Sequence, residues 1–205
     1  HVHSHNLEFK EFERNFKVNN KKTIVDENVD TFFNGILREN GQVATRNYIG
    51  IVSTVNCSAT VTKMIVEKIK YSNILNDYPN IDGIVPITHS TGCGMNTVSE
   101  GMQMFQRTID GFKNHPNFSH VFVIGLGCEC AQVSLFDESV KKHNRIHFLT
   151  IQDEGGTKKI VEKVLSQIKN LLSEANDIKR TPVPVSHLTL ALQCGGSDGY
   201  SGITA

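Results

Sequence analysis

The sequence predicts an α/β fold: an open, mostly parallel five-stranded sheet with flanking helices in Rossmann-like layers. Three observations predict it. Short apolar runs of strand length alternate with segments in which apolar residues recur every three or four positions. The segments between the runs are long enough for the right-handed crossover helices that connect parallel strands. With 205 residues, 39% of them hydrophobic, the chain can bury one sizeable core.

Five apolar runs are expected to form strands, at residues 46–55, 81–89, 120–127, 145–152 and 187–193. The first is rich in β-branched residues, which favour strands. Pro86 lies inside the second and cannot donate a ladder hydrogen bond, which counts against the centre of that strand. The third run, HVFVIGLG, is apolar almost throughout, as is typical of a parallel strand covered on both faces.

Four helices are expected between these strands, at residues 59–75, 96–112, 131–144 and 157–176. The first places Val61, Ile65 and Ile69 four residues apart, on one helical face. In the second, the residues expected on the buried side are Val98, Met102, Phe105 and Ile109. The last helix has the clearest amphipathic pattern in the chain.

Two regions are expected along the chain. Residues 1–43 are polar with two short apolar patches, and we interpret them as the tail of a preceding module and a connector. Residues 44–205 form the α/β domain. The chain does not begin with methionine and ends just beyond a glycine-rich turn, so we expect a piece of a longer protein, truncated before a C-terminal domain.

Charge and composition exclude several classes of partner. Twenty-one basic residues balance 21 acidic ones, so no strong field attracts nucleic acid or an anionic membrane. No apolar run approaches the roughly 20 residues of a membrane span, and the start has no signal-peptide core. The five cysteines are an odd number in a chain large enough to fold without disulfides. We therefore expect a cytoplasmic protein with reduced thiols and small-molecule or protein partners.

Cysteine, histidine and glycine cluster where the predicted strands end. The strand-end segments are residues 55–59, 88–96, 125–132, 151–157 and 193–199, and four of the five contain cysteine. The carboxyl ends of parallel strands meet at one edge, where the ligand crevice of an open α/β sheet lies. Helix starts and glycines at this edge let backbone N–H groups approach an anion. The sequence therefore predicts a ligand site that contains the thiols.

Each of these residues also has a structural interpretation. Any one cysteine can be a small buried hydrophobic residue, and His89 can be a hydrogen-bonded structural histidine. Asp198 can close an Asx turn. The spacing of Cys128 and Cys130 does not match a zinc-ribbon pair. Cys130 also stands where a dinucleotide fingerprint needs glycine or alanine, so neither of those sites is favoured.

Several segments carry a family resemblance. DGIVPITHSTGCGMN, HPNFSHVFVIGLGCE, TIQDEGGTKKIVEK and PVPVSHLTLALQCGGSDGYSGITA, together with GQVATRNYIGIVSTVNCSAT, resemble the altronate and galactarate dehydratase family of hydro-lyases, which also includes sulfolactate sulfo-lyase. The resemblance runs from about residue 41 to the end. HVHSHNL resembles the end of that family's small N-terminal SAF-type module, and the family's chain continues beyond SGITA.

The resemblance implies elimination of water from a small anionic sugar acid, altronate or galactarate, to give a 2-keto-3-deoxy acid. It also implies a divalent metal, with Fe(II) preferred and Mn(II) as the alternative. Removing a proton next to a carboxylate builds negative charge, which oriented N–H groups or a Lewis acid must stabilise. A general base takes the proton, and an acid or the metal assists departure of hydroxide.

The residues expected to carry this chemistry come from the strand ends. The predicted catalytic residues are His89, Cys93, Cys128, Gln152, Cys194 and Asp198. The predicted substrate-binding residues are Asn56, Thr88, Gly155, Gly156 and Ser197. The predicted metal ligands are His89, Cys93, Cys128 and Cys194. Arg46, at the start of the first strand, is expected to be structural.

Two alternatives to the dehydratase remain open on the sequence. One is an elimination of the sulfolactate sulfo-lyase type, which also needs an anionic substrate. The other is a non-catalytic domain that binds a small anion or serves as an interface to the preceding and following domains of a longer protein. An exposed edge can also drive homo-oligomerisation.

Overall fold

The computed structural model of the protein describes residues 31–137 and 145–191. Its strands are β1 (Phe32–Leu37), β2 (Val43–Ala44), β3 (Tyr48–Ser53), β4 (Gly83–Ile87), β5 (Phe118–Gly125), β6 (Ile146–Thr150) and β7 (Thr181–Pro184). Its α-helices are α1 (Asn56–Ser72), α2 (Glu100–Lys113), α3 (Ser134–Asp137) and α4 (Thr157–Asn176), and two short 3₁₀ helices are η1 (Ile74–Asp77) and η2 (Val185–His187).

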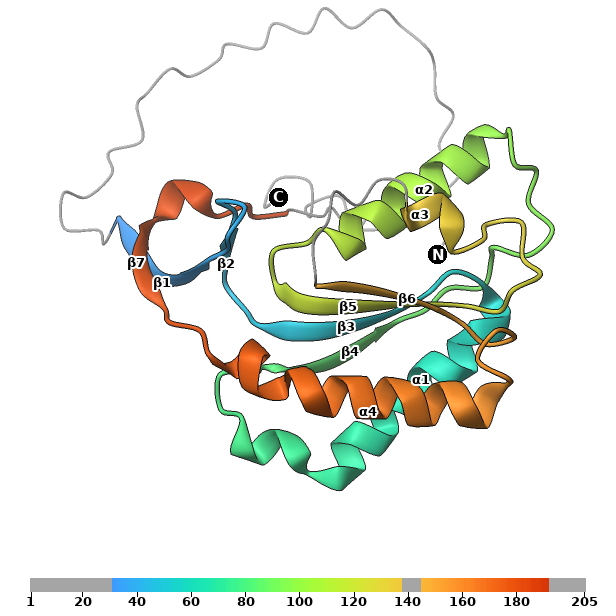
Figure 1. Ribbon diagram of the computed structural model, residues 1–205. Coiled ribbons are helices and arrows are strands. Elements are labelled where there is room, and N and C mark those ends of the chain that lie inside the picture. Colours follow the sequence, from blue (N-terminus) through green and yellow to red (C-terminus); the bar gives the residue numbers. More distant parts are fainter. Residues whose placement is uncertain (1–30, 138–144, 192–205) are drawn as a thin grey trace, which may run out of the picture. The chain divides into compact units, whose positions relative to one another are not determined.

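The main sheet has four parallel strands in the order β4-β3-β5-β6. Helices α1 and α4 cover one face, and α2 and α3 cover the other (Figure 1). This arrangement confirms the predicted α/β class with flanking helices. Within residues 31–137 and 145–191 no helix has the length and apolar character needed to cross a membrane.

Strand β5 lies at the centre of two cores. All eight of its residues are buried, because both of its faces are covered by helices. Phe122 and Ile124 join the apolar cluster under α1 and α4, whereas Val121 and Val123 join the cluster under α2 and α3. This division follows from the alternation of side chains along a strand. Each fully buried side chain of this size stabilises the fold by about 1.5–3 kcal/mol.

A second, antiparallel sheet has the order β2-β1-β7. Strand β1 lies in the segment that the sequence assigned to the connector, and it pairs with β7 from Phe32↔Pro184 to Gly35↔Thr181. The expected fifth strand at residues 187–193 is wrong as far as the structure describes it. His187 ends η2, residues 188–191 have no regular structure, and residues 192–193 lie outside the described part. Beyond β7 these residues pair with neither sheet, which leaves Leu188 and Leu190 49% and 83% exposed.

Helix α1 begins and ends three residues before the predicted 59–75, and it ends at Ser72 because Asn73 adopts the left-handed conformation with a φ angle of +53°. Helix α4 spans residues 157–176 as predicted. Helix α2 begins at Glu100 instead of residue 96, because the Ser99 hydroxyl caps it by accepting a hydrogen bond from the Met102 N–H at 3.2 Å. Val98 therefore precedes the helix and is 80% exposed, so its predicted burial is wrong. Of the third predicted helix, the structure describes Ser134–Asp137 as α3; residues 138–144 lie outside it.

Candidate functional site

Four of the predicted strand-end loops meet at the carboxyl edge of the main sheet. The chain passes from β3 to β4 on one side and then places β5 on the other side of β3. The sheet therefore has a topological switch point between β3 and β5, where open α/β sheets bind ligands. Cys93, Cys128 and Cys130 lie in these loops and Cys57 lies in the first turn of α1, and all four are exposed. Their alternative interpretation as buried hydrophobic residues is therefore wrong.

His89 ties the loop after β4 to the end of β3. Its Nε2 lies 2.8 Å from the Ser53 carbonyl oxygen, and its Nδ1 accepts a hydrogen bond from the Thr91 N–H at 3.2 Å. Because a carbonyl can only accept, the proton of the neutral ring is on Nε2. The ring also packs edge-on against Phe105, at 4.8 Å between centroids. Both ring nitrogens are thus engaged within the protein.

Gly92 lets the loop after β4 lie directly on the loop after β3. A Cβ atom at this position would be 2.2 Å from the Thr54 carbonyl oxygen, and the φ angle of +97° also favours glycine. Next to this contact, the Asn56 N–H donates to the Thr91 carbonyl at 2.9 Å. The loop after β4 therefore packs, backbone against backbone, beside the start of α1.

Glu129 organises the loop after β5, and sequence reasoning missed it. Its side chain is buried, with a relative exposure of 2%. The carboxylate accepts hydrogen bonds from the Leu126 N–H at 3.0 Å, the Gly127 N–H at 2.5 Å and the Thr54 hydroxyl at 2.9 Å. Bonds to a charged acceptor are stronger than neutral ones, so this carboxylate joins the β3 and β5 loops. The available signal was an acidic residue close behind an apolar strand that ends in two glycines.

The loops after β5 and β6 enclose a small hollow of about 300 Å³. It is lined by Gly127, Glu129, Gln132, Val133, Ser134, Thr150 and Asp153. Gln152 borders it: its N–H donates to the Leu126 carbonyl at 3.0 Å, and its side-chain oxygen would be 2.5 Å from a Cβ atom at Gly127. Gly155 and Gly156, with φ angles of +80° and +104°, lead directly into α4.

The starts of two long helices lie at this edge without a side-chain cap. Val55 precedes α1 and Gly156 precedes α4, and neither position supplies a side-chain hydrogen bond to the first turn. Uncapped helix starts present backbone N–H groups and the positive end of the helix dipole. At α1 the Asn56 and Ser58 N–H groups already donate to the Thr91 and Val55 carbonyls, so fewer donors are available there. The edge is therefore suited to a carboxylate ligand.

The predicted site residues differ in how the structure places them. Asn56, Cys93, Cys128, Gln152 and Gly155 are exposed at the edge, whereas Thr88, His89 and Gly156 are half-buried. Cys194, Ser197 and Asp198 lie outside the described residues. Arg46 forms an ion pair with Asp82 at 3.1 Å at the opposite end of the sheet, as its structural interpretation predicts.

The described residues do not fit a metal centre. Within residues 31–137 and 145–191, no three His, Cys, Asp or Glu side chains are grouped so that they could hold a metal ion. His89 and Cys93 follow β4, Cys128 follows β5, and β3 separates these strands by about 10 Å. Ligand atoms of one metal ion lie within about 4–5 Å of one another. His89 would also have to give up one of its hydrogen bonds to bind a metal.

The fold is that of a doubly wound α/β domain, with the candidate site at its switch point. The sequence model of the family described as D-galactarate dehydratase/altronate hydrolase, second domain, matches residues 35–176. The chain therefore belongs to the D-galactarate dehydratase/altronate hydrolase family.

Three characterised relatives agree with this membership. The chain is 31% identical to altronate dehydratase of Bacillus subtilis (strain 168) over 183 residues, which cover 87% of this chain and 35% of the relative. It is 32% identical to altronate dehydratase of Escherichia coli (strain K12) over 170 residues, covering 82% and 33%. It is 36% identical to galactarate dehydratase (L-threo-forming) of the same organism over 181 residues, covering 84% and 34%. The chain spans about a third of the length of these relatives.

Proposed function

We propose that this chain supplies part of the active site of a sugar-acid dehydratase, which removes water from altronate or galactarate to give a 2-keto-3-deoxy acid. The observation that carries the proposal is the position of the β3, β4 and β5 loops. Segments that match a dehydratase family meet at the switch point and are held there by Gly92 and Glu129. The proposed location is the cytoplasm, and the proposed partner is the small anionic substrate.

In the proposed reaction, the substrate carboxylate lies against the uncapped start of α1. A base removes the proton on the carbon beside the carboxylate, and its electron pair forms a double bond to the neighbouring carbon. That carbon loses its hydroxyl as hydroxide, which takes up a proton and leaves as water. The resulting enol then rearranges to the keto acid. The Asn56 N–H already donates to the Thr91 carbonyl, so the Cys57 N–H and the positive end of the α1 dipole stabilise the negative charge that develops on the carboxylate.

His89 is the proposed base. It takes the proton at Nδ1, because Nε2 already carries one and donates it to Ser53. The hydrogen bond from Thr91 to Nδ1 is 3.2 Å long and must open first. Asn56, Thr88 and Gln152 are proposed to bind substrate hydroxyls, as is Ser197 outside the described residues. Cys93, Cys128 and Asp198 remain proposed neighbours of the reacting atoms.

Dependence on iron(II), with manganese(II) as the alternative, is proposed from family membership. The described residues offer no ligand cluster, so Cys194 and other residues outside them are needed to complete such a site. The chain spans about a third of its relatives, so we also propose that further domains of a longer protein border this edge, and that copies of the protein associate.

A specific observation favours a second candidate function, a non-catalytic domain that binds a small anion. The edge has uncapped helix starts, yet His89 has both nitrogens engaged and the described residues form no metal cluster. In that case the edge would bind an acid without converting it.

The test measures 2-keto-3-deoxy acid formation under anaerobic conditions with iron(II) or manganese(II). It compares altronate, galactarate and sulfolactate, for this chain and for a longer form that contains the regions its relatives carry. Product from altronate or galactarate supports the dehydratase, whereas sulfite release from sulfolactate would indicate the sulfo-lyase. If neither form gives a product, the non-catalytic anion-binding domain becomes the favoured function.

The role of His89 is tested by His89→Gln. The glutamine amide can still donate to Ser53 but cannot take a proton, so we expect a loss of turnover of at least about 100-fold with little change in stability. His115→Gln is the matched control, because His115 accepts the Asn117 N–H at 3.1 Å in the same local geometry. His115 lies at the opposite end of the sheet and should tolerate the change. Equal activity of both variants would remove His89 from the mechanism.

A further inference from the structure

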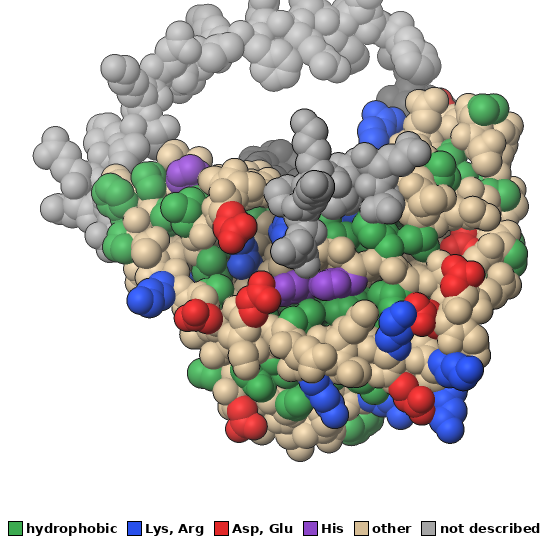
Figure 2. Space-filling model, in the orientation of Figure 1, with side chains coloured by type: hydrophobic (Ala, Val, Ile, Leu, Met, Phe, Trp, Pro, Cys, Tyr) green, Lys and Arg blue, Asp and Glu red, His purple; other side chains and the backbone are tan. Residues whose placement is uncertain are grey.

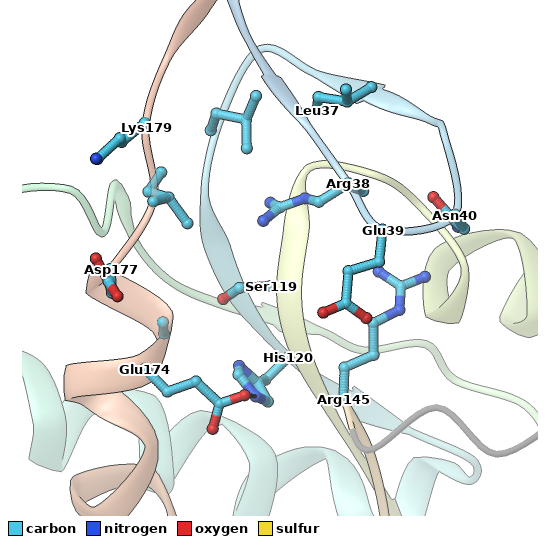
Figure 3. A pocket seen from close by; sticks show the side chains of 13 residues that line it. Leu37, Arg38, Glu39, Asn40, Ser119, His120, Arg145, Glu174, Asp177 and Lys179 are labelled. Atoms are coloured by element: carbon cyan, nitrogen blue, oxygen red, sulfur yellow. Dashed lines mark ion pairs between the residues drawn. The ribbon is translucent and has the colours of Figure 1, made fainter.

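A cavity lies at the amino edge of the main sheet, opposite the candidate site. Its volume is about 490 Å³, within the range of small-molecule pockets. Four parts of the fold meet there: the turn after β1, the start of β5, the residue before β6 and the end of α4 (Figure 3). No sequence motif pointed to it.

One wall carries two arginines, Arg38 and Arg145, and Glu39 also lines the cavity on this side (Figure 3). Arg38 donates from Nε to the Pro116 carbonyl at 2.8 Å, and from Nη2 to the Asn47 side-chain oxygen at 3.0 Å. Arg145 donates from Nη1 to the Phe118 carbonyl at 3.0 Å. Neither forms an ion pair with a carboxylate of the described residues, and the two Nη1 hydrogens of Arg38 have no acceptor there. Carbonyls therefore hold both guanidinium groups in place while N–H donors stay available.

The electrostatics of this wall favour an anion. Burial lowers the pKa of Arg38 to about 10, and the nearby charge of Arg145 contributes to this shift. Burial also lowers the pKa of Arg145. Two positive charges are thus held close together in a partly dehydrated place, and a negative ligand would relieve both their repulsion and their lost hydration.

His120 supplies a second, independent sign of a missing ligand. It lines the cavity and is 6% exposed, and its buried Nδ1 has no hydrogen-bond partner. Its Nε2 lies 3.9 Å from a Glu174 oxygen, too far for a hydrogen bond. Burial, together with the charges of His147, Arg145 and Arg38, lowers its pKa to about 4. The ring is therefore neutral at pH 7, with a buried nitrogen that a ligand could satisfy.

The facing wall carries two carboxylates and one cation, Lys179, and so has a net negative charge. Glu174 and Asp177 line it at the C-terminal end of α4, where helix carbonyls add negative potential (Figure 3). Such a wall repels a multiply charged anion, but its oxygens accept hydrogen bonds from hydroxyl groups. In Figure 2 histidine lies beside acidic side chains near the middle of the face shown. A ligand that suits both walls has one negative charge at one end and several hydroxyls at the other.

We propose that this cavity binds a polyhydroxylated monocarboxylic acid, with its carboxylate at Arg38 and Arg145 and its hydroxyls toward His120, Glu174 and Asp177. The site is separate from the candidate active site, since the two lie at opposite ends of the parallel strands. The inference does not depend on the proposed dehydration.

Calorimetric titration of the 205-residue chain with gluconate tests the proposal. Gluconate should bind saturably at concentrations up to about 10 mM, and propanoate and sorbitol should each bind at least about tenfold more weakly, because each lacks one half of the pattern. Inorganic phosphate is included because it also suits two arginines but not the acidic wall. Phosphate that binds more tightly than gluconate would overturn the assignment of the hydroxyl half.

Arg145→Gln is the informative variant, because the Arg145 side chain forms a single hydrogen bond, to Phe118, whereas the Arg38 side chain bonds both Pro116 and Asn47. We expect gluconate to bind at least about tenfold more weakly to this variant. Arg107→Gln, an exposed arginine on α2, is the matched control and should bind normally.

Three further measurements separate the possible failures. Arg145→Lys keeps a charge and should retain part of the affinity, and a circular dichroism spectrum identifies a variant that fails to fold. The imidazole NMR signals of His120 should shift on titration with gluconate. The proposal is overturned if gluconate does not saturate, or if folded Arg145→Gln binds it as the natural chain does. A loss of affinity in His89→Gln instead would place the ligand at the carboxyl edge.

Discussion

Replacing Glu129 by glutamine should loosen the carboxyl edge of the sheet, because three donors converge on its buried carboxylate. Two backbone N–H groups and the Thr54 hydroxyl donate to it, and glutamine retains only one accepting oxygen. Whichever way the glutamine amide is oriented, at least one of these donors then faces its NH₂ group. The side chain is 2% exposed, so water does not replace the lost bond without a rearrangement.

The size of the effect follows from this count of bonds. A hydrogen bond to a charged acceptor contributes about 1.5–3 kcal/mol, and a buried donor without a partner costs about 1–3 kcal/mol. Allowing for partial relaxation, we expect Glu129→Gln to lower the free energy of unfolding by about 2–4 kcal/mol. For a domain of this size, that corresponds to a fall in Tm of roughly 5–15 °C.

Urea unfolding measures the global change, and amide hydrogen exchange at Leu126 and Gly127 measures the local one. Glu154→Gln is the matched control in the next loop, where the carboxylate forms an ion pair with Lys163 at 2.6 Å. Its loss should cost less than about 1 kcal/mol, because both side chains are partly exposed. If Glu129→Gln changes stability no more than this control and leaves both amides protected, Glu129 does not organise the loop.

Two further predictions concern stability. Gly92→Ala should destabilise the protein by at least about 2 kcal/mol, since the added Cβ would lie 2.2 Å from the Thr54 carbonyl oxygen. The control is Gly111→Ala on α2, where a Cβ has open space, so the free energy of unfolding in urea should stay equal or rise by up to about 1 kcal/mol. Similar urea midpoints for the two variants would refute the close approach at Gly92. The folded-state pKa of His120 is about 4, below its ordinary 6.5, so its contribution is fully present above about pH 6.5 and is lost progressively as pH falls toward 4. Burial acts on His147 in the same direction. For His120 alone the loss between pH 7.5 and 5.0 is about 2 kcal/mol, and it is complete only below about pH 4. Urea midpoints at these two pH values measure it, and an equally steep fall in His120→Gln would contradict the assignment.

Features that depend on local sequence were predicted well, whereas features that depend on contacts between distant segments were not. Periodicity predicted β3, β4, β5, β6 and α4, because the pattern of buried side chains depends on the geometry of each element. That the strand-end segments meet at one edge followed from parallel strands alone. The same patterns gave a wrong fifth strand: Leu188 and Leu190 alternate as a strand would, but no neighbouring strand pairs with them.

The sequence by itself determined the α/β class, most of the elements, the clustering of cysteine and glycine at one edge, and the family. Only the tertiary structure decided which groups are partnered. In the structure both ring nitrogens of His89 form hydrogen bonds, and the buried Glu129 carboxylate accepts from three donors. Arg38 lies near Arg145, which is 107 positions further along the chain. Hydrogen bonds and charges depend on which elements meet in space, and the spacing of residues along the chain does not contain that information.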